Sequence, residues 1–425
     1  MHLKIDKESL KRMKKLASLL LTDQIAAKGT RSYWAPLNQS ESALAIANYA
    51  KDLPGLVIVL TENSQIANQL QDTLAFLVNN SIEILTFPEW ETLPYDQFSP
   101  HQDIVSERLK TLYRLPSLQQ GILIVPIATV MQKVVPHEYI QQFTFLLKTG
   151  DTLDVESFSQ KLESASYQRV GQVYEHGEFA IRGAIIDLFP MGSKTPFRID
   201  LFDDEVESIA WFDPLTGEVL TRPTRVTVYP KSHYVTPKER VLEMVEHVKV
   251  ELKDRLEQLR TMNKLVEAQR LEERTKLDIE MMVELGYCTG IENYSRYLSG
   301  REAGQPPPTL MDYFPKNSLL VIDESHVTIP QIGGMYKGDR SRKENLVGYG
   351  FRLPSALDNR PMMFEEFERA MPQSIFVSAT PGKYEAEHCS TMVEQVVRPT
   401  GLLDPIIEVR PAITQVDDLL GEIRW

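Results

Sequence analysis

Short apolar runs alternate with helix-like patterns over the first ~140 residues of the chain. Residues 56–60 (LVIVL), 82–85 (IEIL) and 122–125 (ILIV) are predicted as buried strands, and helical spacing is found over residues 66–78. Strands that alternate with helices predict a mainly parallel sheet that is covered on both faces. The proline-rich residues 87–95 are predicted as an ordered loop between these elements.

The pattern changes between residues 142 and 235. Strand-length runs are separated by close turn signals, namely Gly177, Gly183, Met191-Gly192-Ser193, Asp203-Asp204 and Asp213-Pro214-Leu215-Thr216-Gly217. This spacing predicts a small β-rich domain that is inserted into the larger α/β domain.

A charged helical stretch follows the β-rich part. Residues 238–285 contain neither glycine nor proline and are rich in Glu, Lys, Arg and Leu. A single helix of that length would span ~70 Å, so two packed helices with a solvated charged face are predicted. The α/β pattern returns after Pro306-Pro307-Pro308, where residues 319–322 and 375–377 are predicted as central parallel strands.

Composition narrows the class of protein. Hydrophobic residues make up 42% and charged residues 25%, as in soluble globular proteins, and no run of 18 apolar residues predicts a membrane span. The basic and apolar residues 11–21 are only superficially similar to a signal peptide and are predicted as an amphipathic helix. Cys288 and Cys389 have no metal-ligand spacing, which predicts a protein of the reducing cytosol without a metal site.

Two acids end one of the predicted strands, in Leu320-Val321-Ile322-Asp323-Glu324-Ser325-His326. Open α/β sheets bind ligands at the carboxyl ends of their strands. In nucleotide hydrolysis, one such carboxylate holds Mg²⁺ while the other orients the attacking water. A strand end followed by a helix N-cap explains the same residues without that role.

A second strand leads into Ser378-Ala379-Thr380, which is followed by Pro381-Gly382. In helicase-like motors such a segment links the nucleotide site to the nucleic-acid surface, although a plain strand-to-turn exit has the same residues. The two segments occur in this order and about fifty residues apart. Together they favour the RecA-like core of a superfamily-2 helicase.

The chain lacks a phosphate-binding loop, because the motif G-x-x-x-x-G-K-[ST] does not occur. In Gly192-Ser193-Lys194-Thr195, Asp187 occupies the place of the first glycine and a predicted strand follows, so a hairpin turn is the better interpretation. Residues 33–40 (YWAPLNQS), where such a loop should stand, contain neither lysine nor glycine.

The best nucleic-acid candidate is a basic and aromatic cluster. Its members are Tyr294, Arg296, Tyr297, Arg301, Tyr336, Lys337, Arg340, Arg342 and Lys343. Arginines can pair with phosphates while tyrosines stack on unpaired bases, but a solvated loop with structural tyrosines remains an equal alternative. Because the formal net charge is −13, any DNA contact must come from a local surface of this kind.

Residues from about 204 onward resemble the UvrB family, the B subunit of the bacterial UvrABC excinuclease. The matching stretches are long and unusual: residues 212–217 (FDPLTG), 229–237 (YPKSHYVTP), 290–298 (GIENYSRYL), 329–336 (IPQIGGMY) and 398–405 (RPTGLLDP). The resemblance implies a degenerate helicase-like α/β domain in two parts and three further units. These are residues 1–141 and 307–398 for the α/β domain, 142–235 for the insertion, 236–306 for a helical subdomain and 399–425 for the start of a second helicase domain.

The first ~205 residues resemble the N-terminal module of a second family, the transcription-repair coupling factor Mfd. Residues 90–96 (WETLPYD), 99–103 (SPHQD) and 175–180 (EHGEFA) carry this resemblance. The Mfd module copies the UvrB architecture but lacks the phosphate loop. The chain is therefore predicted to be a hybrid, with an Mfd-like front half joined to a UvrB-like back half near residues 202–205.

Both families bind UvrA through the inserted domain, which makes UvrA the expected partner. Residues 182–190 (RGAIIDLFP) match the segment that the two families share. By that resemblance Arg182 is the best single candidate for a UvrA contact, with Glu178 and Phe179 beside it, because a guanidinium can pair bidentately with a carboxylate. An internal salt bridge from Arg182 to Asp187 or Glu178 is the structural alternative.

The resemblance also implies residues that act on ATP and Mg²⁺. Asp323, Glu324, His326, Ser378 and Thr380 match UvrB motif positions. They lack the phosphate-loop lysine and the arginines that the second helicase domain supplies in that family, so we expect this chain to bind neither ATP nor Mg²⁺.

The tyrosine-rich hairpin with which UvrB grips damaged DNA is replaced here by residues 90–103. We therefore expect damaged DNA to bind weakly or indirectly, and UvrC to be a partner only by family context. Two functions remain: a UvrA-docking module of nucleotide excision repair without its own ATPase activity, or an ATP-dependent damage-recognition subunit like UvrB. The missing phosphate loop favours the first, and a cytoplasmic location is expected for either.

Overall fold

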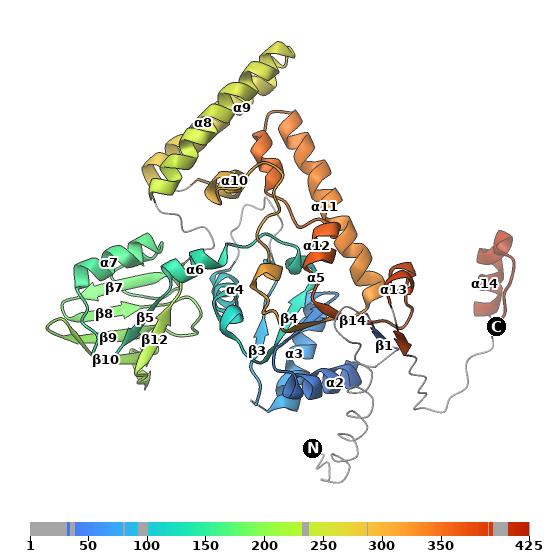
Figure 1. Cartoon of the computed structure of the whole chain (residues 1–425), viewed down its shortest axis with the longest axis horizontal. Helices are drawn as coiled ribbons and strands as arrows, with labels where there is room; N and C mark the ends of the chain where they lie inside the picture. The colour runs from blue at the N-terminus through green and yellow to red at the C-terminus, as the bar shows by residue number, and fades with distance from the viewer. Residues whose placement is uncertain are drawn as a thin grey trace, which may run out of the picture.

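A computed structural model of the chain describes residues 32–34, 39–79, 81–91, 101–231, 238–286, 288–389, 391–393 and 407–424. Figure 1 shows an α/β body, a β-rich part beside it and a long helical hairpin that projects away from both. The predicted amphipathic helix over residues 11–21 and the stretches 92–100, 232–237 and 398–405 lie outside the described residues.

A parallel sheet forms the body. Within the described residues it has seven strands in the order β15-β1-β14-β13-β2-β4-β3, and all neighbouring strands are parallel. The strands are β1 (Ser32–Trp34), β2 (Leu56–Thr61), β3 (Ile84–Thr86), β4 (Gly121–Pro126), β13 (Ser318–Ile322), β14 (Gln373–Val377) and β15 (Thr391–Val393). The predicted strands are confirmed. The three-residue β1, which the hydrophobic pattern does not reveal, lies between β14 and β15.

Both faces of this sheet are covered by helices. Leu56, Ile58 and Leu60 of β2 belong to one core, whereas Val57 and Val59 belong to the other, because successive side chains of a strand point to opposite faces. The first core contains residues of α4 (Gln102–Arg114), α11 (Ser325–Gly348) and α12 (Phe364–Ala370). The second contains residues of α2 (Gln39–Asp52) and α3 (Ser64–Val78). This double burial explains why the strands are continuous apolar runs.

The long helix α11 is a feature that the sequence pattern does not predict. It starts directly after β13 and contains Pro330 and several glycines, residues that normally interrupt helices. Ile329 and Ile332 are buried in the first core and anchor its amino-terminal half to the sheet. Packing therefore stabilises a helix that intrinsic propensity disfavours.

The predicted β-rich insertion is confirmed. Within the described residues it contains a six-stranded sheet in the order β11-β10-β9-β8-β7-β6 and the two-stranded pair β12-β5. Their bounds are β5 (Phe145–Lys148), β6 (Gln168–Arg169), β7 (Glu178–Arg182), β8 (Ile185–Leu188), β9 (Phe197–Phe202), β10 (Glu205–Phe212), β11 (Val219–Thr221) and β12 (Arg225–Val228). Residues of α7 (Val155–Ser164) share a hydrophobic core with alternate residues of this sheet.

Two packed helices follow the insertion, as predicted. They are α8 (Lys238–Thr261) and α9 (Leu265–Leu285), which form the projecting hairpin of Figure 1. Val248 and Leu252 of α8 and Leu271 of α9 are buried in a separate core with Tyr294 and Leu353, which ties the base of the hairpin to the loops around it. None of the helices in the described part of the chain has the length and apolarity that crossing a membrane requires.

The shorter helical elements connect these parts. They are η1 (Leu115–Ser117), α5 (Ile127–Val130), α6 (His137–Phe143), η2 (Ile291–Tyr294), α10 (Ser295–Leu298), η3 (Leu310–Tyr313), η4 (Pro354–Asp358), α13 (Lys383–His388), η5 (Ala412–Thr414) and α14 (Gln415–Ile423).

Arg108 of α4 orders the described part of the predicted proline-rich loop. It is fully buried, and its guanidinium carbon lies 4.0 Å from the ring centroid of Phe87 and 3.8 Å from that of Trp90. Its Nη1 donates a hydrogen bond to the Pro88 carbonyl at 2.8 Å. A desolvated cation between two aromatic faces is strongly attracted to both, so Arg108 fixes residues 87–90 against α4.

We expect Arg108→Ala to lower the free energy of unfolding by about 2–4 kcal/mol, because it removes both ring contacts and leaves a cavity. Arg108→Lys keeps the charge without the planar group and should cost less. Urea unfolding followed by circular dichroism measures both. A loss below about 0.5 kcal/mol for the alanine variant would show that the stacked arginine does not hold the loop.

Candidate functional site

The two segments that sequence analysis singled out meet at one edge of the central sheet. Strands β13 and β14 are parallel neighbours with Ile322 opposite Phe376, so the residues after both strands emerge side by side. Ser378 Oγ lies 2.8 Å from His326 Nδ1, and Glu324 Oε2 lies 3.3 Å from the same nitrogen. These contacts bring the two segments together in space.

A tight turn brings the acids to this edge. Glu324 has a left-handed backbone conformation, with φ of 43°, and α11 begins immediately after it. The Thr380 backbone N–H donates to Ser378 Oγ at 3.1 Å, and the Ser325 hydroxyl donates to the buried Glu385 carboxylate at 2.5 Å. The first bond closes the turn after β14, and the second ties the start of α11 to α13.

The pKa of Asp323 is raised to about 6, mainly by burial and also by repulsion from the neighbouring Glu324. No positive side chain contributes to this shift. Neighbouring carboxylates raise one another's pKa, so this environment disfavours added negative charge.

A cavity of about 450 Å³ opens in front of these residues, between α2, α3 and α11. The carboxylates of Glu62, Asp323 and Glu324 line it together with His326 and Thr380. Its remaining wall is mainly apolar, formed by Ile46, Val59, Ile66, Leu70, Val321, Val327 and Val377. Among the described residues that line the cavity there is neither lysine nor arginine.

These residues do not fit Mg-ATP. A triphosphate needs a lysine and a nest of backbone N–H groups around its β- and γ-phosphates. The segment between β1 and α2, where that nest should stand, is Ala35-Pro36-Leu37-Asn38, and no lysine or arginine occurs from residue 32 to residue 50. Three carboxylates without a lysine or arginine among the described lining residues would repel the phosphates. Gly192-Ser193-Lys194-Thr195 lies in the turn between β8 and β9, as predicted, and supplies no such loop.

Within the described ranges, no group of three or more His, Cys, Asp or Glu side chains is placed to hold a metal ion. Cys288 is buried, and burial raises the pKa of its thiol to about 12, so it is inert as a ligand or nucleophile.

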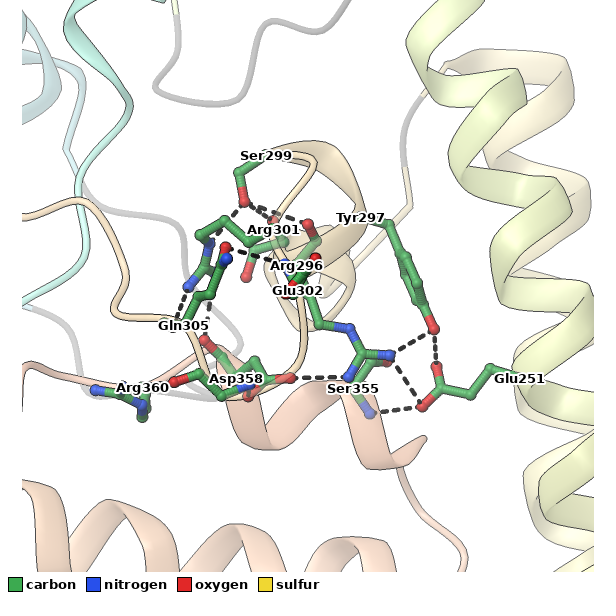
Figure 2. A network of polar contacts seen from close by, with 12 residues as sticks. Glu251, Arg296, Tyr297, Ser299, Arg301, Glu302, Gln305, Ser355, Asp358 and Arg360 are labelled. Atoms are coloured by element: carbon green, nitrogen blue, oxygen red, sulfur yellow. Dashed lines mark hydrogen bonds and ion pairs between the residues drawn. The ribbon is translucent and has the colours of Figure 1, made fainter.

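The basic and aromatic cluster is largely committed to internal contacts. Figure 2 shows Arg296 between Asp358 of η4 and Glu251 of α8. The Arg296 guanidinium donates to Asp358 at 2.8 Å and to the Tyr297 hydroxyl at 2.6 Å, and that hydroxyl donates to Glu251 at 2.9 Å. Arg301 donates to the Gln305 carbonyl at 3.0 Å. This network joins the helical hairpin to the loops above the sheet.

Two further members of the cluster are buried. The Tyr294 hydroxyl donates to Asp278 at 2.8 Å, and burial is the main reason that its pKa is raised. Lys343 is 5% exposed and pairs with Asp339 at 2.9 Å. Side chains that are already buried and paired are poor candidates for DNA contacts, so for Tyr294, Arg296, Tyr297 and Lys343 the structural alternative applies.

The remaining members lie on α11. Lys337 and Arg342 are exposed, Tyr336 is partly exposed, and Arg340 pairs with Glu344 at 2.7 Å at the surface. An exposed ion pair of this kind is weak and can exchange its partner for a phosphate. The residues that remain candidates for a DNA contact therefore lie in one stretch of α11, from Tyr336 to Arg342.

The outer face of the inserted six-stranded sheet, the face opposite α7, carries Arg182, the residue that sequence analysis proposed for a partner contact. Arg182 ends β7 with a side chain that is 49% exposed, and it bonds to Asp187, as the structural alternative foresaw. Glu178 and Phe179 are less exposed than Arg182. The Glu178 carboxylate accepts the N–H groups of residues 174 and 175 at 2.8 and 2.9 Å, and Phe179 is fully buried in the core.

Phe202 is a surface residue that the sequence pattern does not single out. It follows Asp200 by two residues on β9, and Asp200 pairs across the sheet with Ile185, which itself pairs with Arg182. Phe202 and Arg182 therefore share the outer face, at the same end of the sheet. The phenylalanine is 71% exposed, so its ring is open to solvent on this face.

Comparisons with known proteins match these parts individually. Residues 145–234 match the model of the UvrB interaction domain, and residues 239–300 match that of the UvrB third helical domain. These ranges coincide with the β-rich insertion and with the helical hairpin and its base.

Relatives that match about nine tenths of the chain carry the name UvrABC system protein B. The protein of Hydrogenovibrio crunogenus is 57% identical over 398 residues, which cover 91% of this chain and 59% of the relative. The protein of Pseudomonas savastanoi pv. phaseolicola is 51% identical over 397 residues (90% and 59%), and that of Legionella pneumophila is 50% identical over 398 residues (91% and 60%).

The chain spans about three fifths of the length of these relatives. Because only about a tenth of the chain lies outside each match, the similarity reaches well into the first 205 residues. Over about nine tenths of its length the chain is thus similar to UvrABC system protein B, and its insertion and helical hairpin match the interaction and third helical domains of UvrB.

Proposed function

We propose that this protein is a subunit of nucleotide excision repair that docks UvrA through the outer face of its inserted sheet and does not hydrolyse ATP by itself. The observation that carries the proposal is the half-exposed Arg182 on a domain that matches the UvrB interaction domain. UvrA and, within the same system, UvrC are the expected partners. The protein acts in the cytoplasm.

The docking face combines charge with apolar area. Arg182 offers a guanidinium, and Phe202 on the same face offers an exposed ring that a partner can cover. Arginine and aromatic side chains of this kind supply most of the binding energy in protein interfaces. Because the α/β body holds the insertion through a continuous hydrophobic core, the face is presented on a rigid support.

The acidic cavity supports the second part of the proposal. Glu62, Asp323 and Glu324 face a space without basic side chains among its described lining residues, and this arrangement repels a triphosphate. The intact contacts between His326 and Ser378 favour the competing function, an ATP-dependent damage-recognition subunit like UvrB. Geometry of the motifs alone is insufficient for that activity, since the charge of ATP must also be neutralised.

We also propose that the chain is a hybrid of two families. The front half is an Mfd-like module and the back half is UvrB-like, and the Ala35-Pro36-Leu37-Asn38 segment in place of a phosphate loop supports this division. An identity of 57% over the whole match is an average, which can combine a closely similar half with a distant one. In this protein the RecA-like body is a scaffold for docking.

Replacing Arg182 by alanine should weaken UvrA binding at least about tenfold, because a charge-assisted contact of the docking face is lost. Surface plasmon resonance with immobilised UvrA measures the affinity. Arg225→Ala is the matched control, since Arg225 is an exposed arginine of the same insertion on the separate β12-β5 pair. Unchanged binding of the Arg182 variant would place the interface elsewhere.

Isothermal calorimetry with Mg-ATP should show no binding up to about 1 mM, because the cavity lacks basic side chains for the phosphates. A UvrB protein with an intact phosphate loop is the positive control under the same conditions. Micromolar affinity for this chain would overturn the proposal and favour the ATP-dependent function.

A weak single-stranded DNA contact is expected along α11. The double variant Lys337→Ala/Arg342→Ala should lower affinity for a fluorescein-labelled oligothymidine and reduce the slope of log K against log salt by roughly one to two. The control, Lys194→Ala/Arg225→Ala, removes the same charge from exposed positions of the insertion. Equal losses in both variants would mean that net charge, and not α11, governs the binding.

A further inference from the structure

Asp187 is a buried acid that two arginines share. It lies on β8 and is only 3% exposed, directly opposite Arg198 of β9. Arg198 binds both of its oxygens, Nε to Oδ1 at 2.7 Å and Nη2 to Oδ2 at 2.9 Å. The guanidinium of Arg182 donates to the same Oδ2. One carboxylate therefore fixes two guanidiniums on the outer face of the sheet.

The two arginines differ in what else holds them. Arg198 makes a bidentate pair with Asp187, and its guanidinium lies 4.8 Å from the ring centroid of Phe212. Its side chain is 28% exposed, whereas that of Arg182 is 49% exposed. Arg182 makes a single bond to Asp187 and keeps N–H donors for another acceptor. It is the arginine of this pair that a partner can reach most easily.

The charges of this group do not cancel. The two guanidiniums share the carboxylate of Asp187, and Asp200 also acts electrostatically on Arg198, so the less compensated charge is that of the more exposed Arg182. An arginine that is already held in place loses less conformational freedom when it binds than one that moves freely. A carboxylate on the partner pairs best with an arginine that is held in place and still carries positive charge.

We infer that Asp187 is a positioning residue of the docking face: it holds the Arg182 guanidinium ready to pair with a carboxylate of UvrA. The inference rests on the proposed docking function and adds to it the residue that orders the contact. Asp187 itself does not touch the partner, because it is buried beneath the arginines.

A double-mutant cycle tests this role. Affinity for immobilised UvrA is measured for the full chain and for Asp187→Asn, Arg182→Ala and the double variant, with thermal unfolding of each as the folding control. Asparagine keeps one acceptor oxygen but presents an N–H₂ group to one guanidinium, so Arg182 loses its anchor. We expect about tenfold weaker binding for Asp187→Asn alone and almost no further effect of the same change in the Arg182→Ala background.

The control is Asp200→Asn. Asp200 also lies on the outer face and accepts a hydrogen bond from Ser208 at 2.8 Å, so its substitution removes the same charge without breaking an Arg182 contact. Binding within about twofold of the unsubstituted chain is expected. If Asp187→Asn does not fold, Asp187→Ser replaces it, because the smaller side chain leaves room for a water molecule between the guanidiniums.

Three results would overturn the inference, and they differ in what else they remove. Unchanged affinity of Asp187→Asn beside a weak Arg182→Ala variant would show that Arg182 needs no positioning, and the docking proposal would stand. An equal loss from Asp187→Asn in both backgrounds would mean that Asp187 supports the fold and does not act through Arg182. Unchanged affinity of Arg182→Ala would remove the docking proposal and this inference together.

Discussion

This structure depends on one constraint, which is that helices cover both faces of the parallel sheet. Strands β2, β4 and β13 bury every residue between two layers of helices, so a polar side chain can leave the sheet only where a strand ends. Because the strands are parallel and in register, these ends coincide. The acids after β13 and the serine after β14 meet for that reason, whether or not a nucleotide binds there.

The edge of the sheet where β13 and β14 end shows that a nucleotide site needs a suitable charge as well as a suitable geometry. The hydrogen bonds around His326 and Ser378 are those of an assembled site, but the cavity in front of them holds carboxylates without a compensating cation in the described lining. In the function that we propose, this edge keeps the shape of a nucleotide site without the electrostatics that a nucleotide needs. A scaffold function is consistent with such a site, because packing alone maintains its shape.

How an arginine is paired with acids of the same chain decides whether its surface can bind a partner. The net charge is −13, and several arginines of the described part of the chain pair with an acid of the same chain. Arg296 is half-buried between Asp358 and Glu251 and joins two parts of the fold, which makes its role structural (Figure 2). Arg182 is also paired, but its acid is shared with Arg198, so positive charge remains at the surface. Shared pairing keeps a cation both ordered and available.

The sequence by itself determined the parallel α/β class, the β-rich insertion, the paired helices and the lack of a phosphate loop. These follow from local periodicity, turn residues and motif spacing, which neighbouring residues encode. It missed β1 and α11, because a three-residue strand has too few positions for a pattern and packing overrode the proline and glycines of the helix. Only the tertiary structure decided which candidate side chains are buried, as Phe179 and Lys343 are, and which lie exposed on the outer face of the insertion, as Arg182 does. Burial and pairing depend on residues far apart in the chain, such as Arg296 and Asp358, and local sequence patterns do not contain that information.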